Sequence, residues 1–127
     1  MTLEAAAKKA ARGTLNYLSG MAAEDIVTQH YLASGHVVLA RRWRGQAGEI
    51  DVVFRCMDTL VFVEVKKADT FSAAAQRLSS AQIRRVMTAA EEFAATQADG
   101  PLSPIRIDAA LVDASGSVDV IHNVTLD

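Results

Sequence analysis

Two short runs that alternate between apolar and polar side chains constrain the fold of this chain most strongly. The first extends from Glu49 to Arg55 and the second from Leu60 to Lys66. Alternation with a period of two is typical of a β-strand that buries one face. Residues 56–59, between the two runs, predict a turn. The two runs therefore predict a β-hairpin.

This hairpin is expected to have one apolar face and one mixed face. The residues expected on the apolar face are Ile50, Val52, Phe54, Val61, Val63 and Val65. A turn of four residues places Arg55 opposite Leu60. That pair sets the register of the whole antiparallel ladder.

Two acidic side chains, Asp51 and Glu64, face each other in this register. Side chains directly opposite each other have Cβ atoms about 5 Å apart, and two carboxylates at that separation repel each other. A divalent cation between them would remove the repulsion, and Mg²⁺ or Mn²⁺ favours oxygen ligands. The same register places Glu49 opposite Lys66. Lys66 would then help to stabilise charge that develops at a phosphate.

An exposed hairpin with a salt bridge between Glu49 and Lys66 is the alternative interpretation, and the alternation alone supports it equally well. Two features favour the metal site. Leu60, Phe62 and Val53 share the face of the carboxylates, so this face is expected to be covered. The other face is apolar and belongs in the core. A sheet covered on both faces, with acids at one end, is typical of a cleft.

The rest of the chain predicts helices and further strands around the hairpin. An alanine-rich helix that frays is expected within residues 1–18, and a second helix from about Ser19 to Gly35. A third is expected from Ser79 or Ser80 to about Gln97. Residues 36–40, 105–111 and 118–121 predict strands. The order α-βββ-α-ββ predicts one α/β or α+β domain over residues 1–127.

Composition limits the partners that the chain can have. A net charge of −2 and a pI near 5.9 argue against binding nucleic acid by bulk charge alone. Basic residues are instead clustered in Arg41-Arg42-Trp43-Arg44, Lys66-Lys67 and Arg84-Arg85, and a groove lined by them would contact phosphates. No apolar run approaches the ~20 residues that a membrane span needs. With one cysteine as well, the expected location is the cytoplasm, without a membrane partner.

Other side chains are candidates for the same site. Glu24 would supply a third carboxylate from the second helix, although a solvated position is the more common interpretation of such a residue. Gln82 and Arg85 share one face of the later helix, where a solvent-facing role is equally common. Trp43 is more often a core or edge anchor than a platform for base stacking.

The motifs Gly48-Glu49-Ile50-Asp51 and Val61-Phe62-Val63-Glu64-Val65-Lys66 resemble the two strand motifs of the PD-(D/E)XK nuclease superfamily. More narrowly, they resemble the YraN family of small bacterial proteins of uncertain function. The resemblance spans about residues 19–113. Its weaker matches are Gly20, Glu24, Tyr31-Leu32, Gly35 and Arg106-Ile107-Asp108.

This resemblance implies a restriction-endonuclease-like core, in which a central mixed sheet lies between helices. It implies that Asp51 and Glu64 bind Mg²⁺ or Mn²⁺, with the Val65 carbonyl nearby and Glu24 as the helix carboxylate. Lys66 would be the catalytic lysine. The sequence departs from the family pattern at two places where basic contacts are expected. Lys67 and Ala68 follow Lys66, whereas the family commonly has Lys-x-Arg there, and Gln82 stands where a lysine is common.

The main hypothesis is therefore a metal-dependent endonuclease that acts on DNA, and similarity to resolvase-type nucleases suggests branched or damaged DNA. A non-catalytic nucleic-acid-binding module, or a protein-assembly module, on the same fold is the alternative. Small nucleases often dimerise, so a homodimer stays open. The substrate contacts that we expect are Glu49, Arg44, Lys67, Gln82 and Arg85.

Overall fold

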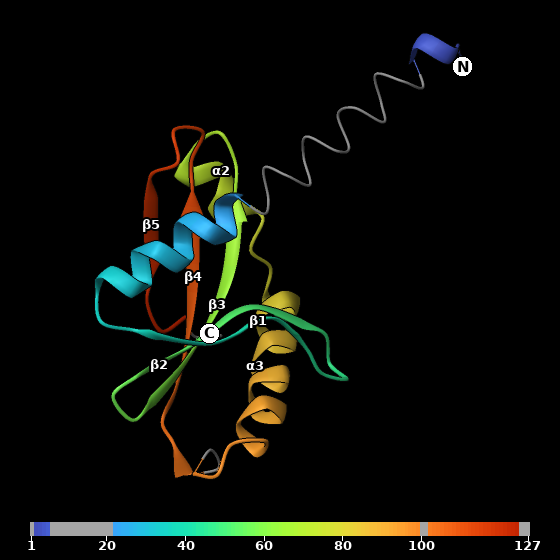
Figure 1. Ribbon diagram of the computed structural model, residues 1–127. Helices are drawn as coiled ribbons and strands as arrows, with labels where there is room; N and C mark the ends of the chain where they lie inside the picture. Colours follow the sequence, from blue (N-terminus) through green and yellow to red (C-terminus); the bar gives the residue numbers. More distant parts are fainter. Residues whose placement is uncertain (1, 6–21, 100–101, 125–127) are drawn as a thin grey trace.

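A mixed five-stranded sheet is the centre of the computed structural model, which describes residues 2–5, 22–99 and 102–124 (Figure 1). Its strands are β1 (Val37–Arg44), β2 (Glu49–Cys56), β3 (Thr59–Lys67), β4 (Ile105–Val112) and β5 (Val118–Ile121). They lie side by side in chain order. Neighbouring strands are antiparallel except β3 and β4, which are parallel. The predicted class, a mixed sheet flanked by helices, is confirmed.

Helices cover both faces of this sheet. Residues 22–33 are helical and lie on the opposite face from α3 (Ser80–Ala95), as Figure 1 shows. Ser79 caps α3 in a capping box with Gln82, so the predicted start is confirmed. No helix in the described residues is long and apolar enough to cross a membrane. The predicted helix within residues 1–18 lies mostly outside the described residues, of which 3–5 are helical.

One helix was missed by the prediction. The α2 helix (Phe71–Gln76) lies between β3 and α3, so the order in the described residues is α-βββ-αα-ββ. Its N-cap is Thr70, whose side chain accepts a hydrogen bond from the Ala73 N–H. Six residues are too few to show helical periodicity, which explains why the sequence pattern did not reveal it.

The core has one apolar cluster on each face of the sheet. The helix of residues 22–33 packs with Ala23, Val27 and Tyr31 against Val52, Phe54, Val61 and Val63. The α3 helix packs with Val86, Ala90 and Phe93 against Ile50, Val53, Leu60 and Phe62. Trp43 joins the α3 cluster through an edge-to-face contact with Phe93, so it is a core anchor.

The predicted register of the hairpin is confirmed where the strands are paired, since Arg55 lies opposite Leu60. The turn is shorter than predicted, because Cys56 and Thr59 still pair and only residues 57–58 connect them. Met57 takes the left-handed conformation that the tight turn requires, with φ of 57°. Shortening the turn by one residue on each side leaves the register unchanged.

The ladder between β2 and β3 ends at Val52 and Val63, and this separation determines where the site lies. Beyond it, β2 pairs with β1, whereas β3 pairs with β4 as far as Lys67. The predicted ladder pairs Asp51–Glu64 and Glu49–Lys66 are therefore wrong. The predicted face of Ile50 is also wrong. Once β2 leaves β3, strict alternation ends, and Ile50 packs with Val53 on the face of α3.

Candidate metal centre

Asp51 lies where β2 and β3 separate. Its Oδ2 accepts a hydrogen bond of 2.8 Å from the backbone N–H of Val65. The side chain thus satisfies a backbone donor that no longer pairs with a carbonyl of β2. This bond holds the Asp51 carboxylate beside the Val65 peptide, which is the pair that the resemblance associates with a metal.

Glu64 is buried on β3, with 7% of its surface exposed. Its Oε1 lies 3.4 Å from Nζ of Lys66. Its Oε2 is buried and has no hydrogen-bond partner in the described part of the chain. An unpartnered buried carboxylate oxygen is costly, because the water lost on burial is not replaced. A cation bound here would satisfy this atom.

Both carboxyl groups resist ionisation in this environment. Burial raises the pKa of Asp51 from 3.8 to about 7, and the nearby charge of Glu64 contributes in the same direction. Burial also raises the pKa of Glu64, although the ammonium of Lys66 and the guanidinium of Arg85 oppose it. A divalent cation would favour the ionised forms of both groups. The residues present therefore fit the Mg²⁺ or Mn²⁺ that the resemblance implies.

We expect the metal-free protein to lose stability as the pH rises from 5 to 8. The folded chain holds a proton on Asp51 up to a pKa of about 7, whereas the unfolded chain releases it near 3.8. Stability is thus highest below the unfolded pKa and is lost as the pH rises through the folded one. Between pH 5 and 8 this loss of stability corresponds to at most about 3 kcal/mol.

Thermal melts in a chelating buffer at four pH values would measure this effect. The variant Asp51→Asn is the control, because its side chain carries no titratable carboxyl group. Its dependence on pH between 5 and 8 should be clearly weaker than that of the wild type. Equal slopes for the two proteins would contradict the raised pKa.

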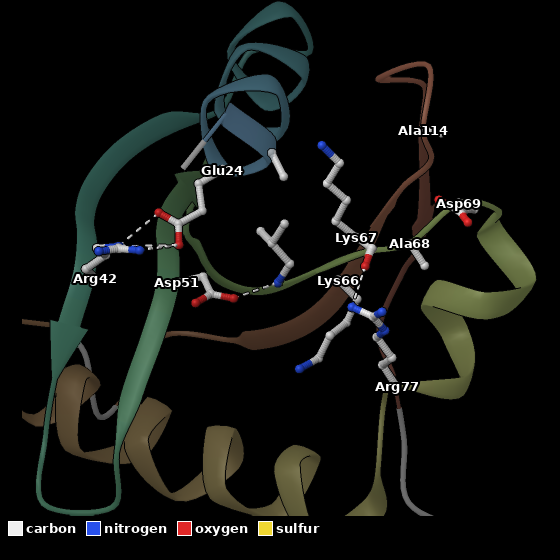
Figure 2. A pocket seen from close by; sticks show the side chains of 11 residues that line it. Glu24, Arg42, Asp51, Lys66, Lys67, Ala68, Asp69, Arg77 and Ala114 are labelled. Atoms are coloured by element: carbon white, nitrogen blue, oxygen red, sulfur yellow. Dashed lines mark hydrogen bonds and ion pairs between the residues drawn. The ribbon is translucent and has the colours of Figure 1, made fainter. Parts of the chain in front are cut away.

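Asp51 borders a hollow of about 730 Å³, shown in Figure 2. This volume lies within the range of small-molecule and cofactor sites. The predicted site residues that line the hollow are Glu24, Asp51, Val65, Lys66 and Lys67. Glu64 contributes to the electrostatics of Asp51 but does not line the hollow. Asp51 thus lies at the edge of an open space that the basic side chains of Lys66, Lys67 and Arg77 also line.

Glu24 is buried, with 6% of its surface exposed, so the solvated interpretation is wrong. Its Oε2 lies 3.1 Å from Nε of Arg42 and 3.7 Å from Nη2 of Arg41. Among the described residues, no three acidic, histidine or cysteine side chains are grouped so that they could hold a metal ion. The role of Glu24 as a third ligand therefore stays a prediction.

The other residues that were expected to contact substrate lie in different parts of the structure. The charges of Arg85 and Glu49 both act on the pKa of Glu64, which Arg85 lowers and Glu49 raises, but neither residue lines the hollow. Gln82 serves the helix cap, since its Oε1 accepts a hydrogen bond from the Ser79 N–H. Arg44 pairs with Glu49 in the β1–β2 ladder and does not line the hollow.

Gly48 gives Arg85 the room it needs beside the acidic pair. A Cβ at Gly48 would lie 2.8 Å from Cδ of Arg85, and the φ of Gly48 is +141°. We expect Gly48→Ala to destabilise the fold by about 1–3 kcal/mol, since it combines backbone strain with a clash. Urea denaturation would measure this change.

Gly35→Ala is the matched control, because Gly35 also has a positive φ, +81°, but a Cβ added there would meet nothing within 4 Å. Gly48→Ala should therefore cost more than Gly35→Ala. Adding Arg85→Ala should recover part of the difference. Equal costs for the two glycine variants would show that contact with Arg85 is unimportant.

Two arginines beside the hollow were missed by sequence reasoning. Arg77 follows α2, and its Nη1 donates a hydrogen bond of 2.9 Å to the Lys67 carbonyl. Arg42, which the sequence places in a basic cluster but not among the expected site residues, contacts Glu24 and lines the hollow. Because α2 was not predicted, the position of Arg77 at its end, beside the hollow, was not predicted either. Nothing in the pattern of β1 distinguishes Arg42 from its basic neighbours.

A buried polar network holds the helix of residues 22–33 on the sheet. Asp108, which is fully buried on β4, accepts hydrogen bonds from the Tyr31 hydroxyl (2.6 Å), Nε of Arg106 (3.0 Å) and the Asn123 N–H (2.9 Å). Burial alone would raise the pKa of Asp108, but these bonds outweigh it and lower the pKa. Tyr31 and Glu24 belong to the same helix, so the helix that carries Glu24 is tied to β4 through Tyr31.

Comparison with known proteins gives a consistent match over most of the chain. Residues 23–112 match the family described as "Uncharacterised protein family UPF0102". A UPF0102 protein of Ruegeria pomeroyi is 46% identical over 90% of this chain and 93% of its own. Relatives from Roseobacter denitrificans and Cereibacter sphaeroides are each 47% identical over 87% of this chain, and over 86% and 95% of their own lengths.

Proposed function

The chain belongs to the uncharacterised protein family UPF0102, the YraN family of the sequence resemblance, and from this premise we propose a metal-dependent endonuclease that hydrolyses phosphodiester bonds in DNA. The observation that best supports the proposal is the half-buried Asp51 near the buried Glu64, whose Oε2 has no hydrogen-bond partner in the described part of the chain. A restriction-endonuclease-like core, a cytoplasmic location and a homodimer are further parts of the proposal.

Asp51, Glu64 and the carbonyl of Val65 would hold Mg²⁺ or Mn²⁺. Two carboxylates suffice for such an ion, because Mg²⁺ usually keeps several of its waters. When bound, the ion would polarise a phosphoryl oxygen and lower the pKa of water. The carboxylates themselves would orient the ion, and the burial of Glu64 would limit the access of bulk water on its side.

Lys66 would stabilise the charge that builds up on the phosphate during the reaction. Its Nζ is held 3.4 Å from Oε1 of Glu64, and its side chain is only 16% exposed, so the ammonium is fixed beside the acidic pair. Lys67 and Arg77 line the same hollow and would bind phosphates next to the one attacked. These contacts are local, which is compatible with the net charge of −2.

Calorimetric titration with Mn²⁺ would test the metal site, with an assay for cleavage of plasmid and branched DNA run in parallel. We expect wild-type protein to bind one ion and to nick or cut DNA, and Asp51→Asn to bind the ion at least about tenfold more weakly. Glu91→Gln is the control, because it removes an exposed carboxylate on α3 away from the hollow. Band shifts without cleavage in any metal would instead favour a non-catalytic DNA-binding module.

A further inference from the structure

Arg42 has an unusual backbone conformation at the point of β1 that faces Asp51. Its φ is +50°, in the left-handed region that residues with a side chain rarely adopt. The β1–β2 ladder includes Arg41–Val52 and Trp43–Ile50, so Arg42 lies at the level of Asp51 on the neighbouring strand. The strand is thus irregular beside the proposed catalytic aspartate. Strain of this kind persists where the surrounding structure imposes it, and it is concentrated at functional sites.

The irregular backbone directs the Arg42 side chain to Glu24. Nε lies 3.1 Å from Oε2 and 3.4 Å from Oε1, and Nη2 lies 3.4 Å from Oε1. Figure 2 shows Glu24 and Arg42 pointing toward each other beside Asp51, at the wall of the hollow. The Glu24 side chain is 8% exposed and that of Arg42 is 39% exposed. A ligand in the hollow can therefore reach the guanidinium more readily than the carboxylate, although both side chains line the hollow.

We propose that Arg42 is a positioning residue that controls Glu24 and exchanges this carboxylate for a phosphate of the substrate. In the free protein the guanidinium holds Glu24, so that Glu24 is not grouped with Asp51 and Glu64 into a three-carboxylate site. Guanidinium binds carboxylate and phosphate with the same fork-like geometry, so a phosphodiester entering the hollow competes for it. Glu24 is then available as a third oxygen ligand. This inference depends on the proposed function.

The inference predicts opposite effects of one substitution on two ligands. Without DNA, Arg42→Gln should bind Mn²⁺ at least about fivefold more tightly than wild type, because Glu24 is released and adds a charged ligand. In a Glu64→Gln background, which prevents cleavage, Arg42→Gln should bind a fluorescent oligonucleotide more weakly. The dependence of that binding on salt should also decrease by about one phosphate contact. If Arg42 only stabilised the fold, replacing it by glutamine would not strengthen the binding of Mn²⁺.

Two further variants serve as controls. Arg42→Lys retains the positive charge, so it should keep most of the salt dependence of binding. Arg41→Gln should change Mn²⁺ affinity less than about twofold, because Arg41 lies 2.8 Å from Asp25 and 3.7 Å from Glu24. If Arg42→Gln does not fold, Arg42→Gly removes the guanidinium and tolerates the positive φ.

The experiment distinguishes this inference from the proposed function. If the wild type binds Mn²⁺ and folded Arg42→Gln or Arg42→Gly shows no gain, the inference alone is overturned. Unchanged DNA binding by these variants would overturn it as well. If neither wild type nor variants bind Mn²⁺, the proposed function and the inference are rejected together. Tighter metal binding with weaker DNA binding would support both.

Discussion

Replacing Glu64 by glutamine is expected to reduce DNA cleavage by about a hundredfold to a thousandfold, the range typical for loss of one electrostatic group in an active site. The amide has nearly the shape of the carboxylate but no negative charge. It would neither hold a divalent cation tightly nor keep the Lys66 ammonium beside the site. Cleavage of a labelled DNA fragment with Mg²⁺ and with Mn²⁺ would measure the effect.

The same substitution should leave the fold intact or stabilise it in metal-free buffer. Glu64 is buried and its Oε2 has no partner among the described residues, so removing the charge removes a desolvation cost. Glu91→Gln, on the exposed face of α3, should change neither cleavage nor stability appreciably. Equal cleavage by wild type and Glu64→Gln would point to a contaminating nuclease and would contradict the assigned site.

Asp108→Ala is expected to have the largest effect on stability, about 3–5 kcal/mol, since it breaks a buried ion pair. The Arg106 guanidinium and the Tyr31 hydroxyl would lose the acceptor that they share. Asp108→Asn keeps an acceptor oxygen and should cost less than the alanine variant. The midpoint of urea denaturation measures the loss.

Tyr31→Phe isolates one bond of this network and should cost about 1–2 kcal/mol. Combined with Asp108→Ala, it should add little, because the partner of the hydroxyl is already gone. Fully additive effects would show that the 2.6 Å bond between Tyr31 and Asp108 contributes nothing measurable to stability.

Local patterns predicted the parts of the fold that depend on local geometry. Alternation identified β2 and β3 and fixed their register at Arg55–Leu60, because side-chain period and turn length are sequence-local properties. The start of α3 followed from its capping serine. The same alternation placed Asp51 and Glu64 on adjacent strands, although the ladder ends before it would pair them directly.

The features that sequence did not reveal depend on tertiary contacts. The β2 and β3 strands separate because β2 continues to pair with β1 while β3 continues to pair with β4. As a result, Ile50 lies on the face of the sheet that α3 covers, which was not predicted. The burial of Glu24 depends on Arg42, which is distant in sequence and has an uncommon φ. Neither the helical periodicity around Glu24 nor the basic run around Arg42 contains this information.

The parallel pairing of β3 with β4 has a consequence for the order in which the protein can assemble. The connection between these strands contains α2 and α3, so β4 is synthesised well after β3. Until β4 is synthesised, the edge of β3 that it will pair with is unpaired. The Tyr31 hydroxyl also has its hydrogen-bond partner, Asp108, only 77 residues later in the chain. Pairing between strands that are this far apart in the sequence is slow. During translation, Asp51 and Glu64 are therefore synthesised before β4, the strand that pairs with β3 and supports it in the folded sheet.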